Sequence, residues 1–163
     1  MLDDKLVELL NDQVNKEFYS AYLYLSMANY YNEEGLSGFG NWFTIQAQEE
    51  RDHAMLFLEY LQNNGAHVEL KTVEAPKKKF KEFKDPLDES LKHERYVTAS
   101  IHNIYAAASK VKDFRTMQFL DWFVKEQGEE EKTAEDLIKK LELFGQDGKG
   151  LYMLDSELAS RTY

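Results

Sequence analysis

Glu50 and His53 lie three residues apart, among apolar neighbours, in the stretch "IQAQEERDHAMLF". On a helix this spacing places a carboxylate and an imidazole one turn apart on the same face, where both can bind one metal ion. A single Glu-x-x-His is weak evidence, because chance alone supplies one in roughly every fifth chain of this length. The rest of the chain has to distinguish a metal site from an ordinary polar stripe.

The composition is that of one globular domain, because 163 residues, 43% hydrophobic and 31% charged, can bury one sizeable core. The absence of cysteine excludes disulfides, thiolate metal sites and a catalytic thiol. The formal charge of -10 argues against nucleic-acid binding and favours attraction of cations. The start "MLDDKLVELL" is acidic where a signal peptide would be basic, and no apolar run approaches the ~18 residues that span a bilayer. No membrane association and a cytoplasmic location are expected.

Apolar residues recur at helical spacing between the glycine clusters, and the only prolines are Pro76 and Pro86. This pattern predicts four long helices at about residues 4–34, 38–64, 85–112 and 116–144, and a short fifth helix at about 151–161. The first two helices are expected to end at Gly35 and Gly65. The third is expected to begin at "DPLDE", with Asp85 as the N-cap and Pro86 at the first helical position.

The connections between these helices differ in length. The first and third connections span only a few residues, so each joins an antiparallel hairpin. The middle connection, about residues 66–84, can extend to about 60 Å, whereas a helix of about 27 residues is about 40 Å long. It can therefore cross the whole bundle and make the second and third helices parallel. An all-α four-helix bundle with one long crossover and a short fifth helix is the predicted fold. The lysines of "PKKKFKEFKD" are expected on a solvated loop and are assigned no function.

Each predicted helix has one inward-facing stripe, and carboxylates interrupt every stripe near its middle. The stripes comprise Leu10, Val14, Glu17, Ala21, Tyr24, Ala28 and Tyr31; Phe39, Phe43, Gln46, Glu50, His53, Phe57 and Tyr60; Leu87, Leu91, Glu94, Thr98, Ile101, Tyr105 and Ala108; and Leu120, Phe123, Gln127, Glu130, Ala134, Leu137, Leu141 and Phe144. Burying several carboxylates together costs several kcal/mol for each uncompensated charge, and like charges repel. A shared metal removes that cost.

The polar core positions also repeat along the chain. The same interval of 77 residues separates Glu17 from Glu94, Glu50 from Gln127 and His53 from Glu130. The two hairpins then present related ligand sets about an approximate two-fold axis, which suits two adjacent metal ions. Glu50 is expected to bridge the ions, with Glu17 and His53 completing one site and Glu94, Gln127 and Glu130 forming the other. Carboxylate-rich sites with one imidazole suit iron or manganese better than structural zinc.

Other polar residues have simpler interpretations. The run "EQGEEEKTAED" is typical of a solvated helix face, and this interpretation is kept for Glu131, Glu135 and Asp136. Tyr24 lies two turns from Glu17, and it either packs as an ordinary core aromatic or acts beside the metals.

Five motifs together resemble those of the non-haem ferritins of bacteria and archaea with a catalytic ferroxidase centre: "NKEFYSAYLYLSMA", "QEERDHA", "KHERYVTASIHNIY", "WFVKEQGEEE" and "GQDGKGLYMLD". The resemblance covers nearly the whole chain. It implies a homo-oligomeric hollow shell of twenty-four subunits with octahedral symmetry. Such a shell oxidises Fe(II) with dioxygen or hydrogen peroxide and stores a ferric oxyhydroxide mineral.

The resemblance also implies roles for individual residues. Glu17, Glu50 and His53 would bind the first iron, and Glu50, Glu94 and Glu130 the second, with Gln127 close by. Tyr24 would donate a hydrogen bond beside the metals and act as an electron source. Glu49, Glu126 and Glu129 match a third iron position found in prokaryotic ferritins.

Some positions depart from related ferritins. Haem-bearing bacterioferritins have a methionine haem ligand after the Glu of the second-helix motif, whereas this chain has Arg51, so no haem is expected. Met55, a full turn away, is expected to pack as apolar filler. The early fourth helix offers Met117 and Leu120 where animal ferritins line three-fold pores with acids, so the route by which iron enters the shell stays open.

The second hairpin also departs from the bacterioferritin pattern, because it has Gln127-x-x-Glu130 in place of a second Glu-x-x-His. Because one imidazole is missing, the second site is expected to hold its ion less firmly than the first. Iron is therefore expected to pass through the centre as a substrate. The last segment has Leu151, Leu154 and Leu158 on one side but is too short to stand alone. It is expected to be ordered by neighbouring subunits, as is the fifth helix of the family.

Two other classes of protein stay open at this point. One is a soluble di-iron oxidoreductase, such as a peroxide reductase like rubrerythrin, although the chain lacks a Cys-x-x-Cys electron-transfer module. The other is a structural or signalling bundle without metal, which would leave the buried carboxylates unexplained.

Overall fold

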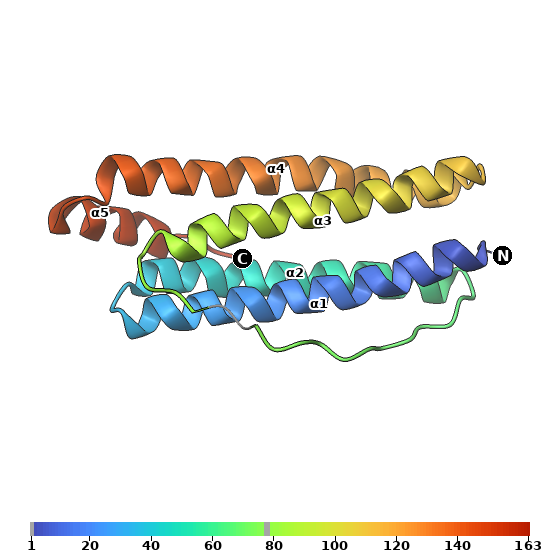
Figure 1. Cartoon of the computed structure of the whole chain (residues 1–163), viewed down its shortest axis with the longest axis horizontal. Helices are drawn as coiled ribbons and strands as arrows, with labels where there is room; N and C mark the ends of the chain where they lie inside the picture. Colours follow the sequence, from blue (N-terminus) through green and yellow to red (C-terminus); the bar gives the residue numbers. More distant parts are fainter. Residues whose placement is uncertain (1, 77–78) are drawn as a thin grey trace.

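A computed structural model describes residues 2–76 and 79–163, and the described chain contains helices and no strand. The helices are α1 (Asp4–Glu33), α2 (Ser37–Asn63), α3 (Asp85–Lys110), α4 (Phe114–Phe144) and α5 (Gly148–Ala159). The four long helices run side by side, and α5 lies at one end of the bundle (Figure 1). The predicted all-α class is therefore confirmed. None of the described helices combines the length and the apolar character needed to cross a membrane.

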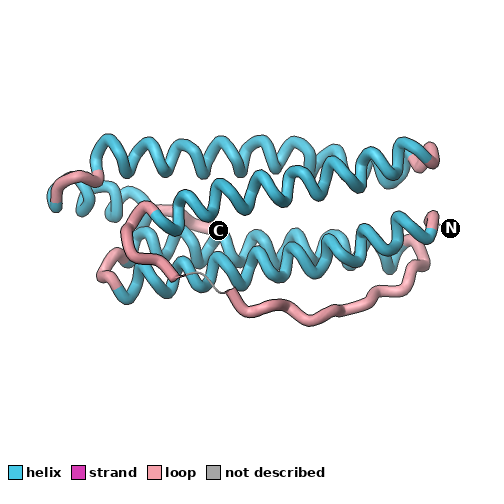
Figure 2. Tube along the Cα trace, in the orientation of Figure 1, coloured by secondary structure: helices cyan, strands magenta, loops and turns pink. Residues whose placement is uncertain are grey.

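The crossover between α2 and α3 passes along the outside of the bundle, from the end that holds the N-terminus to the end that holds α5 (Figure 2). Side chains of α1 bind it: the Asn11 amide donates to the His67 carbonyl oxygen at 3.0 Å, and the Asn15 amide donates to the Thr72 carbonyl oxygen at 3.0 Å. This path makes α2 and α3 parallel, as expected. In the lysine run of the crossover, residues 77 and 78 lie outside the described residues, while Lys79 is exposed.

Helix ends follow the stop and start signals of the sequence, with one exception. Gly35 and Gly65 have φ angles of +82° and +68°, which reverse the chain after α1 and α2 at no steric cost to a residue without Cβ. The expectation that Asp85 caps α3 is wrong, because the N-cap position is Lys84. The Asp85 carboxylate instead accepts from the backbone N–H groups of Lys81 and Glu82, at 2.7 and 2.9 Å, and so stabilises the turn before the helix.

The core consists of two apolar clusters separated by a polar layer. One cluster contains Tyr31, Phe39 and Leu137 and the other contains Leu10, Phe57 and Ile101. On each long helix a buried glutamate falls between the positions that belong to the two clusters: Glu17, Glu50, Glu94 and Glu130. Phe144 is an exception to the predicted inward stripe of α4, because it is 57% exposed. It is the last residue of α4, which extends past the start of α3 at this end of the bundle (Figure 1).

Helix α5 packs on its own chain, where Leu154 and Leu158 are buried. The Phe39 N–H at the start of α2 donates to the Asp155 carboxylate at 2.9 Å. A Cβ at Gly38 would lie 1.7 Å from the Asp155 carbonyl oxygen, so α5 can approach α2 this closely only because residue 38 is glycine. The expectation that neighbouring subunits order this segment is therefore wrong for its apolar face. Its other side exposes Tyr152 and remains open to contacts.

Candidate metal centre

Acidic side chains from all four long helices meet in the polar layer. They form two groups whose possible ligand atoms lie within 4.8 Å of one another: Glu17, Glu50 and His53, and Glu50, Glu94 and Glu130. Every member of both groups is buried. Because Glu50 belongs to both groups, one carboxylate is in a position to contact both ions of an adjacent pair. The structure thus brings together the five residues that the sequence singled out.

The first group contains two buried polar atoms with no hydrogen-bond partner among the described residues, Glu17 Oε2 and His53 Nδ1. His53 Nδ1 lies 3.3 Å from Glu50 Oε2. The imidazole is held in place by edge-to-face contacts with Trp122 and Phe123, with ring centroids 5.4 and 5.8 Å away. Buried oxygen and nitrogen atoms are normally hydrogen-bonded. A metal ion between them would satisfy both atoms, so these residues fit such a ligand.

The second group is surrounded by hydrogen-bond donors. The Tyr24 hydroxyl donates to Glu94 Oε1. The Gln127 amide donates to the other oxygen of Glu94, Oε2, at 3.0 Å. Tyr24 is therefore more than a packing aromatic, because its hydroxyl orients a carboxylate of the centre. Gln127 contributes a neutral donor to Glu94 at the position where a second Glu-x-x-His would place its Glu.

Burial raises the pKa of every carboxyl group of the centre. It is the largest cause in raising the pKa of Glu17 to about 8, that of Glu94 to about 7 and that of Glu130 to about 8. The pKa of Glu50 also rises well above its ordinary value, because burial is reinforced by the charges of Glu94 and Glu130. Without a cation these groups hold protons near neutral pH. A bound cation would replace the protons and remove the repulsion.

Two glutamines support the carboxylates and were not given a role from the sequence. The Gln13 amide donates to Glu17 Oε1 at 2.7 Å, and its own carbonyl oxygen accepts from the Ser100 hydroxyl at 2.7 Å. The Gln46 amide donates to Glu50 Oε1 at 3.1 Å and to Glu130 Oε2 at 2.9 Å. Each glutamine precedes the Glu on its own helix by four residues, and this spacing was the available signal.

The acidic residues expected to form a third site are arranged differently. Glu49, Glu126 and Glu129 do not join the compact ligand groups found in the described part of the chain. Glu49 pairs with Arg161 at 2.6 Å, and Glu129 pairs with Lys125 at 3.4 Å. The pKa of Glu126 is raised mainly by its partial burial and also by Glu129 and Glu49, so the three carboxylates do share one neighbourhood. Binding a third ion there would require these ion pairs to open.

Two residues outside the centre bear on expectations from the sequence. Met55 is 39% exposed in the isolated chain, so the expectation that it packs as apolar filler is wrong within its own chain. Leu120 is fully buried in the apolar cluster of Leu10 and Phe57, as predicted for a member of the inward stripe. Its place in the inward stripe of α4 had indicated the core.

The fold and the buried groups define the class as a ferritin-like helical bundle with candidate metal-binding groups in its core. Residues 7–144 match the sequence family described as "Ferritin-like domain". The chain is 40% identical over 163 residues to the bacterial non-heme ferritin of Staphylococcus aureus strain USA300, covering all of this chain and 98% of that protein. The chain belongs to the ferritin family of iron-storage proteins.

Solved structures of archaeal ferritins have the same fold. The chain superposes on the open pore ferritin of the hyperthermophilic archaeon Archaeoglobus fulgidus with a TM-score of 0.96 and 44% identity, covering 99% of this chain and 98% of that one. It superposes on a protein described as a humanized archaeal ferritin with a TM-score of 0.97 and 42% identity, covering 100% and 99% of the two chains.

Proposed function

We propose that this chain is a ferroxidase that oxidises Fe(II) with dioxygen or hydrogen peroxide. The ferric product is deposited as an oxyhydroxide mineral inside a hollow shell of 24 copies. The observation that carries the proposal is the pair of buried atoms without a hydrogen-bond partner among the described residues, Glu17 Oε2 and His53 Nδ1, beside carboxyls whose burial is unfavourable without a cation. Membership of an iron-storage family makes iron the natural cation.

Each ion has its own ligand set in this proposal. Glu17, Glu50 and His53 bind the first Fe(II), while Glu50, Glu94 and Glu130 bind the second. Because the carboxyls hold protons in the metal-free chain, binding of the ions releases protons. The aromatic side chains of Trp122 and Phe123, which pack against His53, shield the first ion from water.

The chain's contribution to the chemistry is to hold two reductants side by side. Each Fe(II) loses one electron, and dioxygen accepts both electrons and two protons to become hydrogen peroxide. Placing both ions against one oxidant avoids the unfavourable one-electron reduction of dioxygen. Tyr24, whose hydroxyl donates a hydrogen bond to Glu94, is the proposed source of one electron when only one Fe(II) occupies the centre, so that dioxygen still receives two electrons.

Iron leaves this centre as a product instead of remaining as a cofactor. The second ion has only carboxylate ligands, with the neutral Gln127 beside them, and is held less firmly than an ion with an imidazole ligand. Glu49, Glu126 and Glu129 form the proposed third binding position, on the way to the mineral. Opening of the Arg161–Glu49 ion pair is the step that frees Glu49 for this role.

Size-exclusion chromatography after aerobic loading with Fe(II) tests the proposal against the other classes. The expected result is a very large species that carries many iron atoms per chain. A small protein that retains about two irons per chain would indicate a di-iron oxidoreductase instead. A protein that elutes without iron would indicate a bundle with a purely structural role.

A further inference from the structure

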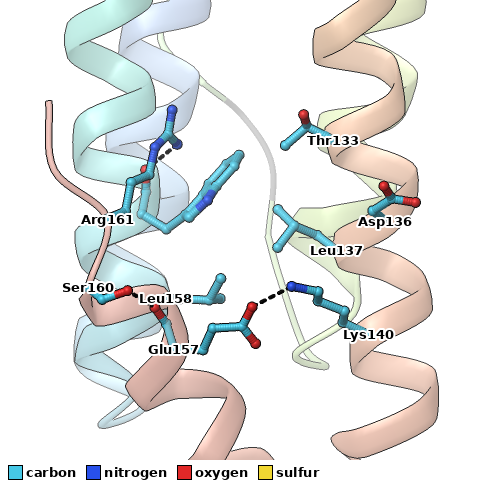
Figure 3. A pocket seen from close by; sticks show the side chains of 9 residues that line it. Thr133, Asp136, Leu137, Lys140, Glu157, Leu158, Ser160 and Arg161 are labelled. Carbon is cyan, nitrogen blue, oxygen red and sulfur yellow. Dashed lines mark hydrogen bonds and ion pairs between the residues drawn. The ribbon is translucent and has the colours of Figure 1, made fainter.

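Arg161 connects the C-terminal end of the chain to α2. It lies just beyond the end of α5, and its Nη1 donates to the Trp42 carbonyl oxygen at 3.1 Å and to Gln46 Oε1 at 3.0 Å. Its Nη2 donates to Glu49 Oε2 at 2.6 Å, and the guanidinium stacks 4.2 Å from the Trp42 ring centroid. Arg161, Lys140 and Glu157 are among the residues that line a cavity of about 370 Å³. Figure 3 shows the side chains of these residues.

The backbone around Arg161 is held as firmly as its side chain. The Asn41 amide on α2 donates to the carbonyl oxygens of Arg161 at 3.1 Å and Leu158 at 3.4 Å. The Arg161 side chain is only 21% exposed. The guanidinium is therefore a fixed donor, whose position depends on the docking of α5.

Gln46 links this guanidinium to the candidate metal centre. Its carbonyl oxygen faces Arg161, and its amide nitrogen donates to Glu50 and Glu130. A guanidinium can only donate hydrogen bonds, whereas an ionised carboxylate can only accept them. Arg161 and the two carboxylates therefore fix the orientation of the Gln46 amide from opposite ends. In the absence of Arg161 only the carboxylates hold the amide, and its oxygen loses the donor that anchors it on the side away from the centre.

We propose that Arg161 is a positioning residue for the metal centre, which acts through Gln46 to hold Glu50 and Glu130 as ligands of the second metal ion. This inference rests on the proposed function. Two members of the second group, Glu50 and Glu130, accept hydrogen bonds from Gln46, whereas in the first group only the shared Glu50 does so. Loss of Arg161 therefore weakens the second ion more than the first.

Anaerobic titration with Co(II), followed by its visible absorption, tests this proposal without relying on oxidation activity. The native chain should bind two ions. Arg161→Ala should weaken the second binding step by about tenfold or more and leave the first within a small factor, because the partners of metal ligands typically contribute that much to affinity. Arg161→Lys keeps the charge but cannot donate to Trp42, Gln46 and Glu49 together, so it should give an intermediate affinity.

Three further variants separate positioning from simpler explanations. Glu157→Gln removes the charge that pairs with Lys140 beside the same cavity but leaves the Arg161–Gln46 contact, and it should retain native affinity at the second step. Asn41→Ala removes a hydrogen bond to the Arg161 backbone but leaves every contact of the Arg161 side chain, and its second step should weaken less than that of Arg161→Ala. Gln46→Ala should weaken the second step, and adding Arg161→Ala to it should cause no further loss, because the two residues act through one contact.

The outcomes distinguish this inference from the proposed function. If the native chain fails to bind two ions, the proposed function fails and the inference fails with it. If the native chain binds two ions and Arg161→Ala binds them equally well, only the inference fails. Equal weakening of both steps in Arg161→Ala, or the same loss in Asn41→Ala, would assign Arg161 a structural role and also overturn the inference.

Discussion

At the scale of single residues, the centre holds groups whose charge state depends on whether a metal is present. The pKa of Glu17 is raised by burial from 4.5 to about 8. Between these two values the folded chain binds more protons than the unfolded chain. The stabilisation that comes from the protonated carboxyl is complete below the unfolded pKa and is lost as the pH rises through the folded pKa. Glu94 and Glu130 have raised pKa values and act in the same direction.

We therefore predict that the melting temperature of the metal-free protein falls between about pH 5 and about pH 8. A saturating divalent metal should reverse this trend, because it binds the deprotonated carboxylates. Differential scanning calorimetry at several pH values measures both effects. Glu17→Gln serves as the control, since it removes one titrating group and should make the metal-free slope shallower. A metal-free melting temperature that rises over this range would contradict the pKa values of the centre.

The ligand residues should affect oxidation far more than assembly. We predict that His53→Ala or Glu130→Ala slows rapid Fe(II) oxidation by at least about tenfold while the shell still forms, because each change removes a ligand without altering a helix end. Stopped-flow absorbance measures the rate, and size-exclusion chromatography measures assembly. His102→Ala is a matched control, because this histidine is exposed and lies outside both ligand groups. Rapid oxidation at the native rate in both ligand variants would remove these residues from the centre.

At the scale of elements, the docking of α5 against α2 depends on the absence of a side chain at Gly38. We predict that Gly38→Ala displaces α5, since the new Cβ would overlap the Asp155 backbone, which cannot move aside by rotating a bond of a side chain. Increased proteolysis near residue 150 and a lower melting temperature are the expected signs. Gly148→Ala is the control, because a Cβ there meets no atom within 4 Å. Equal behaviour of the two variants would show that the contact between α5 and α2 is not close in solution.

The elements themselves were largely predictable from the sequence. Glycine stops, apolar periodicity and the long middle connection predicted the bundle and its crossover, because these signals act within one helix or one loop. The two ligand groups followed from charges at core positions. Gln46 and Arg161 could not be assigned in this way, because they are separated by 115 residues and meet only after α5 has docked. The cap of α3 was missed because the Asp85 carboxylate turns back toward the preceding loop.

At the scale of the whole molecule, one side of α5 packs on its own chain and the other side is open to contacts with neighbouring subunits. Its leucines pack on the chain's own core, whereas its exposed side carries Tyr152 and Met153 at 73% and 63% exposure. We predict that truncation after Gly150 lowers the melting temperature and prevents formation of a stable shell, because it uncovers core side chains and removes the outward apolar face. Calorimetry and size-exclusion chromatography measure the two effects. A truncated chain that assembles and retains iron as well as the full-length chain would contradict this assignment.

The central claim is that the buried carboxylates repeatedly bind Fe(II), hold it while dioxygen or hydrogen peroxide oxidises it, and then release the ferric product. Sequential addition of Fe(II) in air, two ions per chain at a time, tests this claim most directly, with the rapid oxidation and the iron left at the centre measured after each addition. The predicted result is rapid oxidation that recovers as iron leaves the centre for the mineral. Continued rapid oxidation of later iron while the first two ions stay bound at the centre would contradict it, because iron would then be acting as a permanent cofactor.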